Sequence, residues 1–395
     1  MSEAPARLAL CGNVFPAESV AAAREVLQRE LPALQHAWHA RSQAAWQPGY
    51  GLYLAAAAIA ELRAAPSLRA NFLAEARDCA WPIWTANAFP FGGFHAERVK
   101  EQAFLPDWRS PQRLEYTIGV AEFLAELMPA GERGSLSTCP IGYGPDARED
   151  PQSAGHLRRL GSELDRLADT HGVELTLAIE PEPDGGFERV DALCAWLERH
   201  AQHERIGVCW DLCHSAVVGE RAEEVLHALT ATGVPLGKVQ VSAALRSGPG
   251  FGEAARALTQ ALAEDRYFHQ ARWTAGDQQR AWLDLPVLIA APDWEQSLGL
   301  DRNAGELRVH CHVPIHSGAQ VDGWLPTDWR SMLRAAHQAG CRDFEVETYT
   351  LPVLPEALLP AAQAGGARSS LAETMADELL AAAVEIGLDT GPADP

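Results

Sequence analysis

Short apolar runs alternate along the chain with longer segments in which apolar residues recur at helical spacing. The short runs predict strands, and they are too uniformly apolar for a sheet that has one face in water. These runs are residues 8–11, 82–86, 135–138, 175–179, 206–210, 238–242, 308–313 and 344–349. The segments with helical spacing are 19–34, 154–171, 192–203, 223–232, 252–264 and 329–339. The pattern therefore predicts a parallel sheet covered by helices.

Eight strands that alternate with helices predict an α/β fold, a (β/α)8 TIM barrel, in one domain over residues 1–364. Segments 36–80 and 95–130 are expected to be helical insertions after strands 1 and 2. Segment 244–305, between strands 6 and 7, is long enough to form a lid or pocket wall. Residues 365–388 predict a C-terminal helix, and residues 389–395 a disordered tail.

Composition and charge narrow the class of partner. The 395 residues include 32 Lys and Arg against 53 Asp and Glu, for a formal net charge of −21. Such an acidic surface repels phosphate backbones, so we expect no nucleic-acid partner. The eight cysteines show no Cys-x-x-Cys spacing, which indicates reduced thiols. With no leader and no apolar run long enough to span a bilayer, we expect a cytoplasmic protein without membrane insertion.

Polar residues gather at the C-terminal tips of the expected strands, where barrels of this kind build their active sites. Carboxylates and imidazoles that converge from several strands would repel and desolvate one another unless a cation joined them. A divalent metal ion is therefore expected, with Mn²⁺, Zn²⁺ or Co²⁺ favoured by the donor types and Mg²⁺ as a further candidate. The candidate metal ligands are Glu180, Asp211, Gln240, His310, His312 and Glu347.

Each of these residues also has a purely structural interpretation. Glu180 or Glu182 could be a loop acid that faces solvent, since prolines bracket both. Either histidine of the pair at 310 and 312 could be a core residue bonded to a backbone carbonyl. Glu345 could pair with an arginine in the lower layer of the barrel. The sequence does not decide which member of the pairs at 180/182, 310/312 and 345/347 faces the site.

The run at 207–214, Gly-Val-Cys-Trp-Asp-Leu-Cys-His, resembles the fifth-strand motif of xylose isomerase-like barrels. That superfamily includes sugar isomerases and epimerases as well as endonuclease IV-type repair enzymes. The resemblance implies that Glu180, Asp211 and Glu347 bind the metal, and His312 is similar to a histidine of the multi-metal members. Where the superfamily commonly has a sixth-strand histidine this chain has Gln240, for which His310 or His312 could compensate.

A second resemblance covers nearly the whole chain. Segments 13–19, 91–95, 99–108, 179–183, 266–270, 310–314 and 345–350 are similar, in this order, to EboE-type metabolite-traffic proteins. The resemblance implies a role in secondary metabolism, a small-molecule metabolite, and contact with other proteins of a metabolite-traffic pathway; an oligomer is compatible with it. It implies no particular substrate.

Two classes of function follow. The first is a metal-dependent sugar isomerase- or epimerase-like protein for a small hydroxy-carbonyl compound or secondary-metabolite precursor, in which Glu180, Glu347 or Glu182 moves a proton. The second is a non-catalytic carrier whose barrel mouth is lined by Trp108, Tyr143, Tyr267 and Trp273. Endonuclease IV-like phosphodiester hydrolysis is a third interpretation, which the acidic charge disfavours. The candidate substrate contacts are His95, Lys100, Tyr143, His214, His269 and His316.

Overall fold

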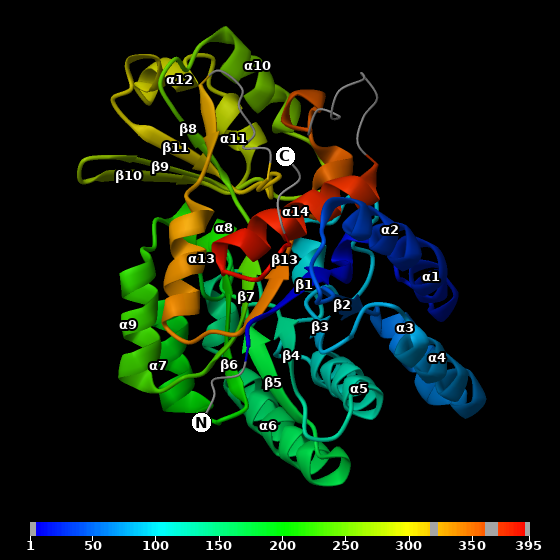
Figure 1. Ribbon diagram of the computed structural model, residues 1–395. Coiled ribbons are helices and arrows are strands. Elements are labelled where there is room, and N and C mark those ends of the chain that lie inside the picture. Colours follow the sequence, from blue (N-terminus) through cyan, green and yellow to red (C-terminus); the bar gives the residue numbers. More distant parts are fainter. Residues whose placement is uncertain (1–4, 317–322, 360–369, 392–395) are drawn as a thin grey trace.

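Eight parallel strands close into a barrel in a computed structural model that describes residues 5–316, 323–359 and 370–391 (Figure 1). Around the barrel each strand neighbours the next in the chain, and the last one, β13, closes the circle between β7 and β1. The strands are β1 (Arg7–Cys11), β2 (Gly49–Tyr53), β3 (Thr85–Asn87), β4 (Arg133–Thr138), β5 (Glu174–Ile179), β6 (Ile206–Asp211), β7 (Leu236–Val241) and β13 (Asp343–Val346). The predicted (β/α)8 barrel is confirmed.

Two of the predicted strands need correction. Strand β2 lies inside segment 36–80, which the sequence assigned to a helical insertion, so the run at 82–86 leads into the third barrel strand and not the second. The run at 308–313 is not a barrel strand, because β11 (Glu306–Val309) belongs to a separate sheet. Strand β2 was missed because its glycines interrupt the run of apolar residues that marks a buried strand. The barrel interior requires one of these glycines, because a Cβ on Gly51 would lie 1.6 Å from Glu345 Oε1.

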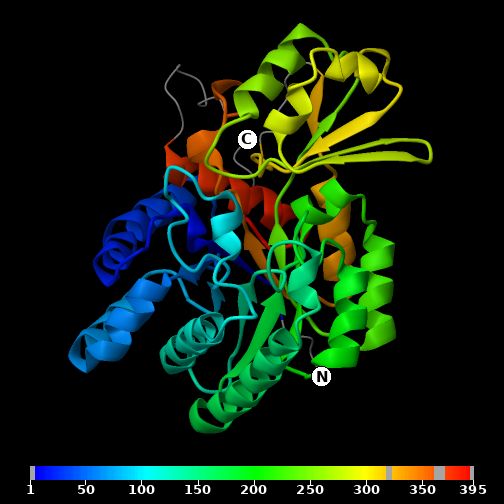
Figure 2. The same ribbon diagram turned by 180° about the vertical axis from the view of Figure 1, so that it is seen from behind.

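Helices surround the barrel, as Figures 1 and 2 show from opposite sides. Segment 95–130 is not an insertion, because its helix α5 is the ordinary connection between β3 and β4. The helices are α1 (Val20–Glu25), α2 (Leu31–Arg41), α3 (Ala56–Ala64), α4 (Pro66–Asp78), α5 (Pro111–Leu127), α6 (Pro151–His171), α7 (Val190–His200), α8 (Leu212–Val218), α9 (Ala222–Thr232), α13 (Trp329–Gln338) and α14 (Leu371–Glu385). None of the described helices is long and apolar enough to cross a membrane.

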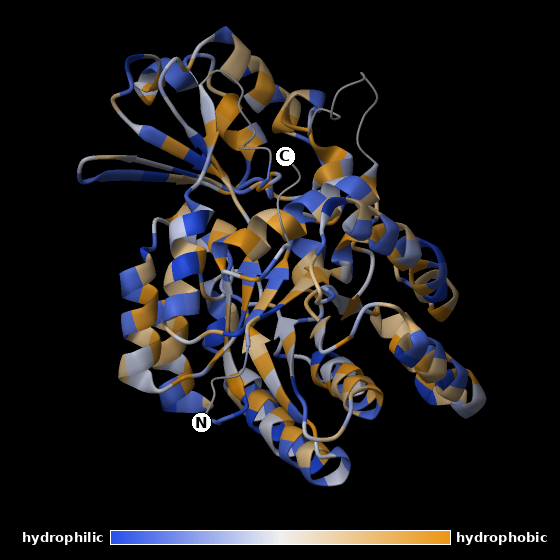
Figure 3. Ribbon diagram, viewed as in Figure 1, coloured by the Kyte–Doolittle hydropathy of each residue, from blue (hydrophilic) through white to orange (hydrophobic). Residues whose placement is uncertain are grey.

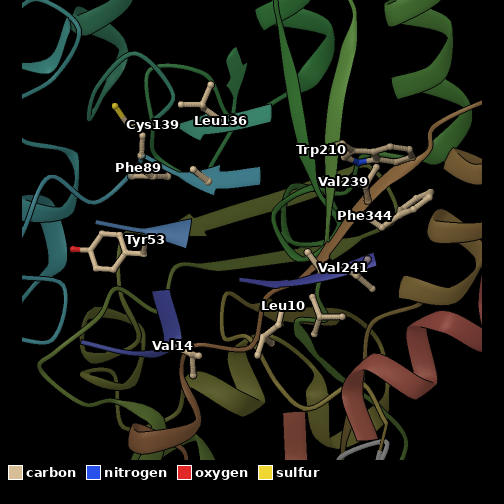
Figure 4. Packing of buried hydrophobic residues seen from close by; sticks show 14 of the residues in the cluster. Leu10, Val14, Tyr53, Phe89, Leu136, Cys139, Trp210, Val239, Val241 and Phe344 are labelled. Carbon is tan, nitrogen blue, oxygen red and sulfur yellow. The ribbon is translucent and has the colours of Figure 1, made fainter. Parts of the chain in front are cut away.

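The main hydrophobic core lies between the strands and these helices. The outer helices are amphipathic: α6 buries Leu157, Leu160, Leu164 and Leu167 at helical spacing, and Figure 3 shows hydrophilic and hydrophobic residues on the same helix. Strand side chains such as Trp210, Val239 and Phe344 pack in this layer (Figure 4). The alternate residues of the same strands point into the barrel, where they are available for a site.

A second sheet interrupts the barrel between β7 and β13, and therefore between its seventh and eighth strands rather than its sixth and seventh. It pairs β8 (Leu245–Ser247), β9 (Ala271–Ala275), β10 (Gln278–Trp282), β11 and β12 (Trp324–Pro326) in the order β10-β9-β11-β8-β12. Helices α10 (Glu253–Leu262), α11 (Leu285–Ile289) and α12 (Trp294–Ser297) accompany it. In Figure 1 this insertion lies at one end of the barrel.

The C-terminal segment returns to the start of the chain. Helix α14 occupies most of the predicted 365–388 helix, whose first five residues lie outside the described ones, and it packs against α2. Residues 389–391, which the sequence assigned to a disordered tail, are instead held in place: Asp389 O accepts from Trp46 Nε1 at 2.7 Å and Thr390 O from the Gln43 amide at 3.2 Å. The rest of that predicted tail, 392–395, lies outside the described residues.

A buried ion pair fills the barrel interior below the strand ends. Lys238 Nζ donates to Glu345 Oε2, and it lies 3.3 Å from Thr85 Oγ1 and 3.4 Å from the Ala86 carbonyl. Both charged side chains are 0% exposed. Glu345 thus pairs with a lysine and not with the arginine that the sequence suggested. Burial opposes the charge on Lys238, but the Glu345 carboxylate outweighs it and raises the lysine pKa.

We expect Lys238→Met to destabilise the fold by about 3–5 kcal/mol, because it leaves Glu345 as an unpaired charge in the interior. The double variant Lys238→Met/Glu345→Gln removes that charge and should recover a large part of the loss. Chemical denaturation of the native protein and both variants measures this. A single variant as stable as the native protein would contradict the role of the pair.

Candidate metal centre and pocket

Three carboxylates meet at the C-terminal ends of three barrel strands. Glu180 follows β5, Asp211 ends β6 and Glu347 follows β13. All three are buried, and one oxygen from each lies within 4.8 Å of the others. Parallel strands end at the same side of the barrel, so each strand delivers its carboxylate to one point. The arrangement brings together the three residues that the sequence implied as ligands.

Local structure directs one oxygen of Asp211 into this cluster. Asp211 is the N-cap of α8, and its Oδ1 accepts from the His214 backbone amide at 2.8 Å. Ser242 Oγ donates to the same oxygen at 2.9 Å. Asp211 Oδ1 therefore accepts two hydrogen bonds within the protein, whereas Asp211 Oδ2 is buried without a hydrogen-bond partner.

Two asparagines hold Glu347 in a similar way. Asn13 Nδ2 donates to Glu347 Oε1 at 2.5 Å, and Asn87 Nδ2 lies 3.4 Å from the same oxygen. Sequence reasoning gave neither residue a role. The signal that could have found them is their position, since Asn87 ends β3 and Asn13 follows β1 at the same side of the barrel.

Three imidazoles stand beside the carboxylates: His214, His310 and His312. Asp211, His214 and His312 form one group of donor atoms within 4.8 Å of one another, and Glu182, His214 and His310 form another. Each ring places Nδ1 against an oxygen acceptor, so we assign the proton to Nδ1 and the free lone pair to Nε2. The acceptors are Pro181 O at 3.0 Å for His214, Gln270 Oε1 at 2.7 Å for His310 and Glu347 O at 2.9 Å for His312.

The donor set fits a divalent cation. Buried polar atoms are normally hydrogen-bonded, and a group of unpartnered ones calls for a water or an ion. Oxygen and imidazole donors together suit Mn²⁺, Zn²⁺, Co²⁺ or Mg²⁺. Cys213 also lies near His310 and His312, but burial raises the pKa of its thiol well above the ordinary value. Within the described part of the chain, the buried cluster atoms without a hydrogen-bond partner are Glu180 Oε2, Asp211 Oδ2, His310 Nε2 and His312 Nε2. Both amide atoms of Gln240, the residue of β7 that pairs with Asp211, are also buried without a partner.

Electrostatics strengthens this conclusion. Burial, then the charges of Glu347 and Asp211, raise the pKa of Glu180 well above its ordinary value. Burial and the charge of Asp211 do the same to Glu347. Burial lowers the pKa of His214 to about 4 and that of His310 well below the ordinary value. The metal-free site therefore retains protons on carboxyls and none on these imidazoles, and a cation would replace those protons.

A pocket with about 520 Å³ of empty volume, partly open to solvent, adjoins the cluster. Glu180, Glu182, His214, His310 and Glu347 line it, so both members of the 180/182 pair face the site. Asp211, Gln240 and His312 are not among the lining residues. The insertion contributes to the pocket wall, because Tyr267, Phe268 and His310 belong to it. His310 and His312 therefore reach the site from the loop after β11 and not from a barrel strand.

The structure divides the candidate substrate contacts. His214 and Lys100 line the pocket, whereas the other four do not. His316 is directed to Glu378 of α14, which accepts from the His316 backbone amide at 3.1 Å. The remaining three lie behind the wall: His95 Nε2 is 3.0 Å from Asn13 O, His269 Nδ1 is 2.8 Å from His310 O, and Tyr143 stacks on Phe268 with ring centroids 5.6 Å apart.

The aromatic pocket expected for a carrier has different members. Of the four residues that the sequence suggested, Tyr267 lines the pocket. Trp108 is buried with its Nε1 bonded to Thr138 Oγ1 at 3.2 Å, and Trp273 Nε1 donates to Leu298 O at 3.0 Å. Both tryptophans belong to the hydrophobic core. The aromatic wall is formed instead by Phe89, Phe94, Phe104, Tyr267, Phe268 and Tyr349.

Comparison with solved structures identifies the fold. The chain is similar to a xylose isomerase-like TIM barrel protein from Mycobacterium smegmatis in complex with magnesium, at 11% identity and a TM-score of 0.52, with 96% of this chain and 98% of that one covered. It is also similar to a protein from Anabaena variabilis assigned as a sugar phosphate isomerase/epimerase, at 15% identity and a TM-score of 0.50, with 98% and 100% covered. An L-ribulose 3-epimerase matches at 12% identity and a TM-score of 0.45, with 99% and 100% covered.

These likenesses show that the fold is that of the xylose isomerase-like TIM barrels. No protein-family model matches the chain, and no curated protein sequence matches it significantly.

We expect the purified protein to bind a divalent cation, and Asp211→Asn/Glu347→Gln to lose it, because the double variant removes two anionic donors. The asparagine retains an Oδ1 acceptor for His214 and Ser242, so the fold should persist. Asp191→Asn/Glu224→Gln, around the surface residue Arg189, is the control with the same change in charge. Elemental analysis measures the result. The site would be refuted if the Asp211→Asn/Glu347→Gln variant kept its full metal content, or if the native protein bound no metal after metal was added.

The apparent affinity for the cation should increase at least about tenfold from about pH 5.5 to about pH 7.5, because protons compete for the same oxygens. Carboxyls with the ordinary pKa of 4.5 would already be ionised at the lower pH and would give little change. Without metal, the native state keeps protons that the unfolded chain releases above that value. This contribution to stability therefore falls as the pH rises through the raised pKa. Metal titrations across this pH range test the expectation, and a flat profile would contradict it.

Proposed function

We propose that the protein is a divalent-metal-dependent isomerase or epimerase for a small hydroxy-carbonyl compound. The observation that carries this proposal is the convergence of buried carboxylates and imidazoles, with unpartnered lone pairs, beside a pocket that is partly open to solvent. Proton transfer next to a carbonyl needs a base and a means of stabilising charge on oxygen. The fold supports the proposal, because the Anabaena variabilis protein is assigned to the same class of reaction.

Glu180, Asp211 and Glu347 would hold the cation, with His312 and Gln240 completing the donor set. Gln240 stands where related barrels commonly have histidine, and its two unpartnered amide atoms keep an oxygen available. His310 offers a further unpartnered nitrogen. The cation would supply Lewis-acid polarisation of the substrate oxygens when bound.

Glu182 is the residue best placed to move the proton. It lines the pocket but lies outside the group formed by the three ligand carboxylates. Burial, then the charges of Asp211 and Asp184, raise the pKa of Glu182 well above the ordinary value. This shift makes the carboxylate a stronger base for a carbon-bound proton.

The Glu182 carboxylate would take the proton from the carbon that bears the hydroxyl group; the C–H electron pair forms the C=C bond of an enediolate and the carbonyl π pair moves onto the carbonyl oxygen. Returning the carbon-bound proton to the former carbonyl carbon, with transfer of the hydroxyl proton to the other oxygen, isomerises the substrate. Return to the opposite face of the same carbon epimerises it and needs a second group. Glu180 and Glu347 also line the pocket and could serve as that group. His214, whose Nδ1 is held by Pro181 O, would direct Nε2 toward a substrate hydroxyl.

The carrier function remains a second candidate because six aromatic side chains line the pocket. Such a protein would hold a precursor without turnover. The resemblance to EboE-type proteins supports a secondary-metabolite precursor and partners in metabolite traffic for either function. Phosphodiester hydrolysis finds less support, because Lys100, the one basic residue among the described pocket lining, is paired with Asp284.

We expect the metal-loaded protein to exchange the carbon-bound proton of at least one α-hydroxyketone with D₂O. Glu182→Gln should lower that rate by about 10²–10⁴-fold, because it removes the base. The metal content should not change if the cation is held by Glu180, Asp211 and Glu347, whereas its loss would assign the cation to the group of Glu182, His214 and His310. Glu174→Gln, at the exposed start of β5, the strand that precedes Glu182, is the matched control. Proton NMR of a panel of ketoses and hydroxyketones measures exchange. If none exchanges although metal is bound, the carrier function is the better conclusion.

A further inference from the structure

The pocket is divided by polarity. Its acidic and imidazole groups lie together at the metal-capable cluster, whereas the rest of its surface is largely aromatic. Phe94, Tyr267 and Tyr349 come from three separate parts of the chain and contact one another, with ring centroids 5.0–5.3 Å apart. Phe89 and Phe104 pack 5.5 Å apart elsewhere in the lining. The Tyr267 hydroxyl donates a hydrogen bond to the Phe94 carbonyl oxygen at 3.1 Å, so this hydroxyl already has a partner within the protein.

The pocket offers no free positive charge among its described lining residues. Lys100 is the single Lys or Arg there, and its Nζ lies 2.5 Å from Asp284 Oδ2. Both side chains are buried, at 7% and 9% exposure. Asp284 is itself fixed, because its Oδ1 accepts from the backbone amides of His269 at 3.1 Å and Leu285 at 3.0 Å. The charge of Lys100 is therefore neutralised before a ligand enters.

This pocket is expected to bind a phosphorylated ligand weakly. Phosphate recognition normally uses unpaired arginine, lysine or a helix N-terminus to offset about two negative charges. In the metal-loaded protein the cation would be shared with Glu180 and Glu347, and Lys100, the single Lys or Arg among the described lining residues, is already paired with Asp284 and cannot bind the phosphate. A free sugar fits the cluster, but several of its remaining hydroxyls would face Phe89, Phe94, Phe104 and Phe268, which cannot accept conventional hydrogen bonds, and this costs free energy. Asn13 and Asn87 also line the pocket, but their Nδ2 groups are engaged with Glu347.

We propose that the ligand of this pocket is an uncharged hydroxy-carbonyl group attached to an apolar, ring-sized substituent. The proposal rests on the proposed function for the polar group and goes beyond it for the substituent. The polar group lies at the carboxylate and imidazole cluster, and the substituent lies against the aromatic wall of Phe94, Tyr267 and Tyr349. Charge selectivity comes from Asp284, which keeps Lys100 from binding an anion.

The test compares three probes that share one hydroxymethyl ketone group: dihydroxyacetone, dihydroxyacetone phosphate and 2-hydroxyacetophenone. Each is titrated calorimetrically into the metal-loaded full chain in buffer that contains the same metal. We expect 2-hydroxyacetophenone to bind at least about tenfold more tightly than dihydroxyacetone, because burial of a ring is favourable. Dihydroxyacetone phosphate should bind no more tightly than dihydroxyacetone. Tighter binding of the phosphate than of the phenyl ketone overturns the proposal.

Asp284→Asn tests the origin of the charge selectivity. The asparagine keeps the Oδ1 acceptor for the two backbone amides but releases the charge of Lys100. We expect this variant to bind dihydroxyacetone phosphate about tenfold more tightly than the native protein does, and 2-hydroxyacetophenone equally well. Asp191→Asn, which removes one of the two carboxylates paired with Arg189 and does not touch the pocket, is the control for net charge. Unchanged phosphate affinity in Asp284→Asn overturns the role of the Lys100 pair.

Failure of this inference is distinguishable from failure of the proposed function. If the phenyl ketone binds but no probe exchanges its carbon-bound proton, the ligand class stands and isomerisation fails. If exchange occurs and the phosphate is the preferred probe, isomerisation stands and the ligand class is wrong. If none of the three probes binds to the metal-loaded protein, both are wrong.

Discussion

The burial of like charges at one end of the barrel is the constraint on which the rest of the site depends. Glu180, Asp211 and Glu347 lie within 4.8 Å of one another and are all buried. Each would favour water over this position unless it kept a proton or shared a cation. The surrounding residues relieve only part of this cost: Ser242 donates to Asp211 Oδ1 and Asn13 to Glu347 Oε1, whereas Glu180 Oε2 and Asp211 Oδ2 have no hydrogen-bond partner. Such a site is organised for a positively charged occupant.

The interior below the cluster is polar for a related reason. Barrels of this type usually fill their centre with branched apolar side chains. Here the pair Lys238–Glu345 occupies that space, and Gly51 provides room for the carboxylate. The positive charge of Lys238 also affects the carboxylate cluster. Burial and neighbouring carboxylates raise the pKa values of Glu180 and Glu347, and Lys238 lowers them by a smaller amount. Lys238 therefore contributes both to the stability of the barrel interior, through Glu345, and to the ionisation of the carboxylates at the site.

What the sequence could predict follows from where strand ends lie. Glu180, Asp211 and Glu347 became candidates because parallel strands bring their C-terminal residues to one side. The strand ends alone left the choice within 180/182 and 345/347 open, and the resemblance to xylose isomerase-like barrels singled out these three. Strand β2 was missed because its glycines, which the interior requires, break the apolar pattern that marks a buried strand. His310 and His312 reach the site although their run was assigned to the wrong sheet. His316 could not be placed, because its direction depends on Glu378, which lies 62 residues later in the chain.

The carboxylates of the site and the aromatic wall of the pocket come from different parts of the fold. The carboxylates come from or next to barrel strands, whose pairing fixes their positions. Much of the aromatic wall comes from other segments, namely the loop after β3 and the insertion between β7 and β13. Phe268 and Asp284 belong to that insertion, and Lys100 connects it to the β3 loop. A change in these loops can alter the shape and charge of the wall without moving the carboxylates. On the proposed function, selection of the ligand would depend on loop residues, and proton transfer on strand ends.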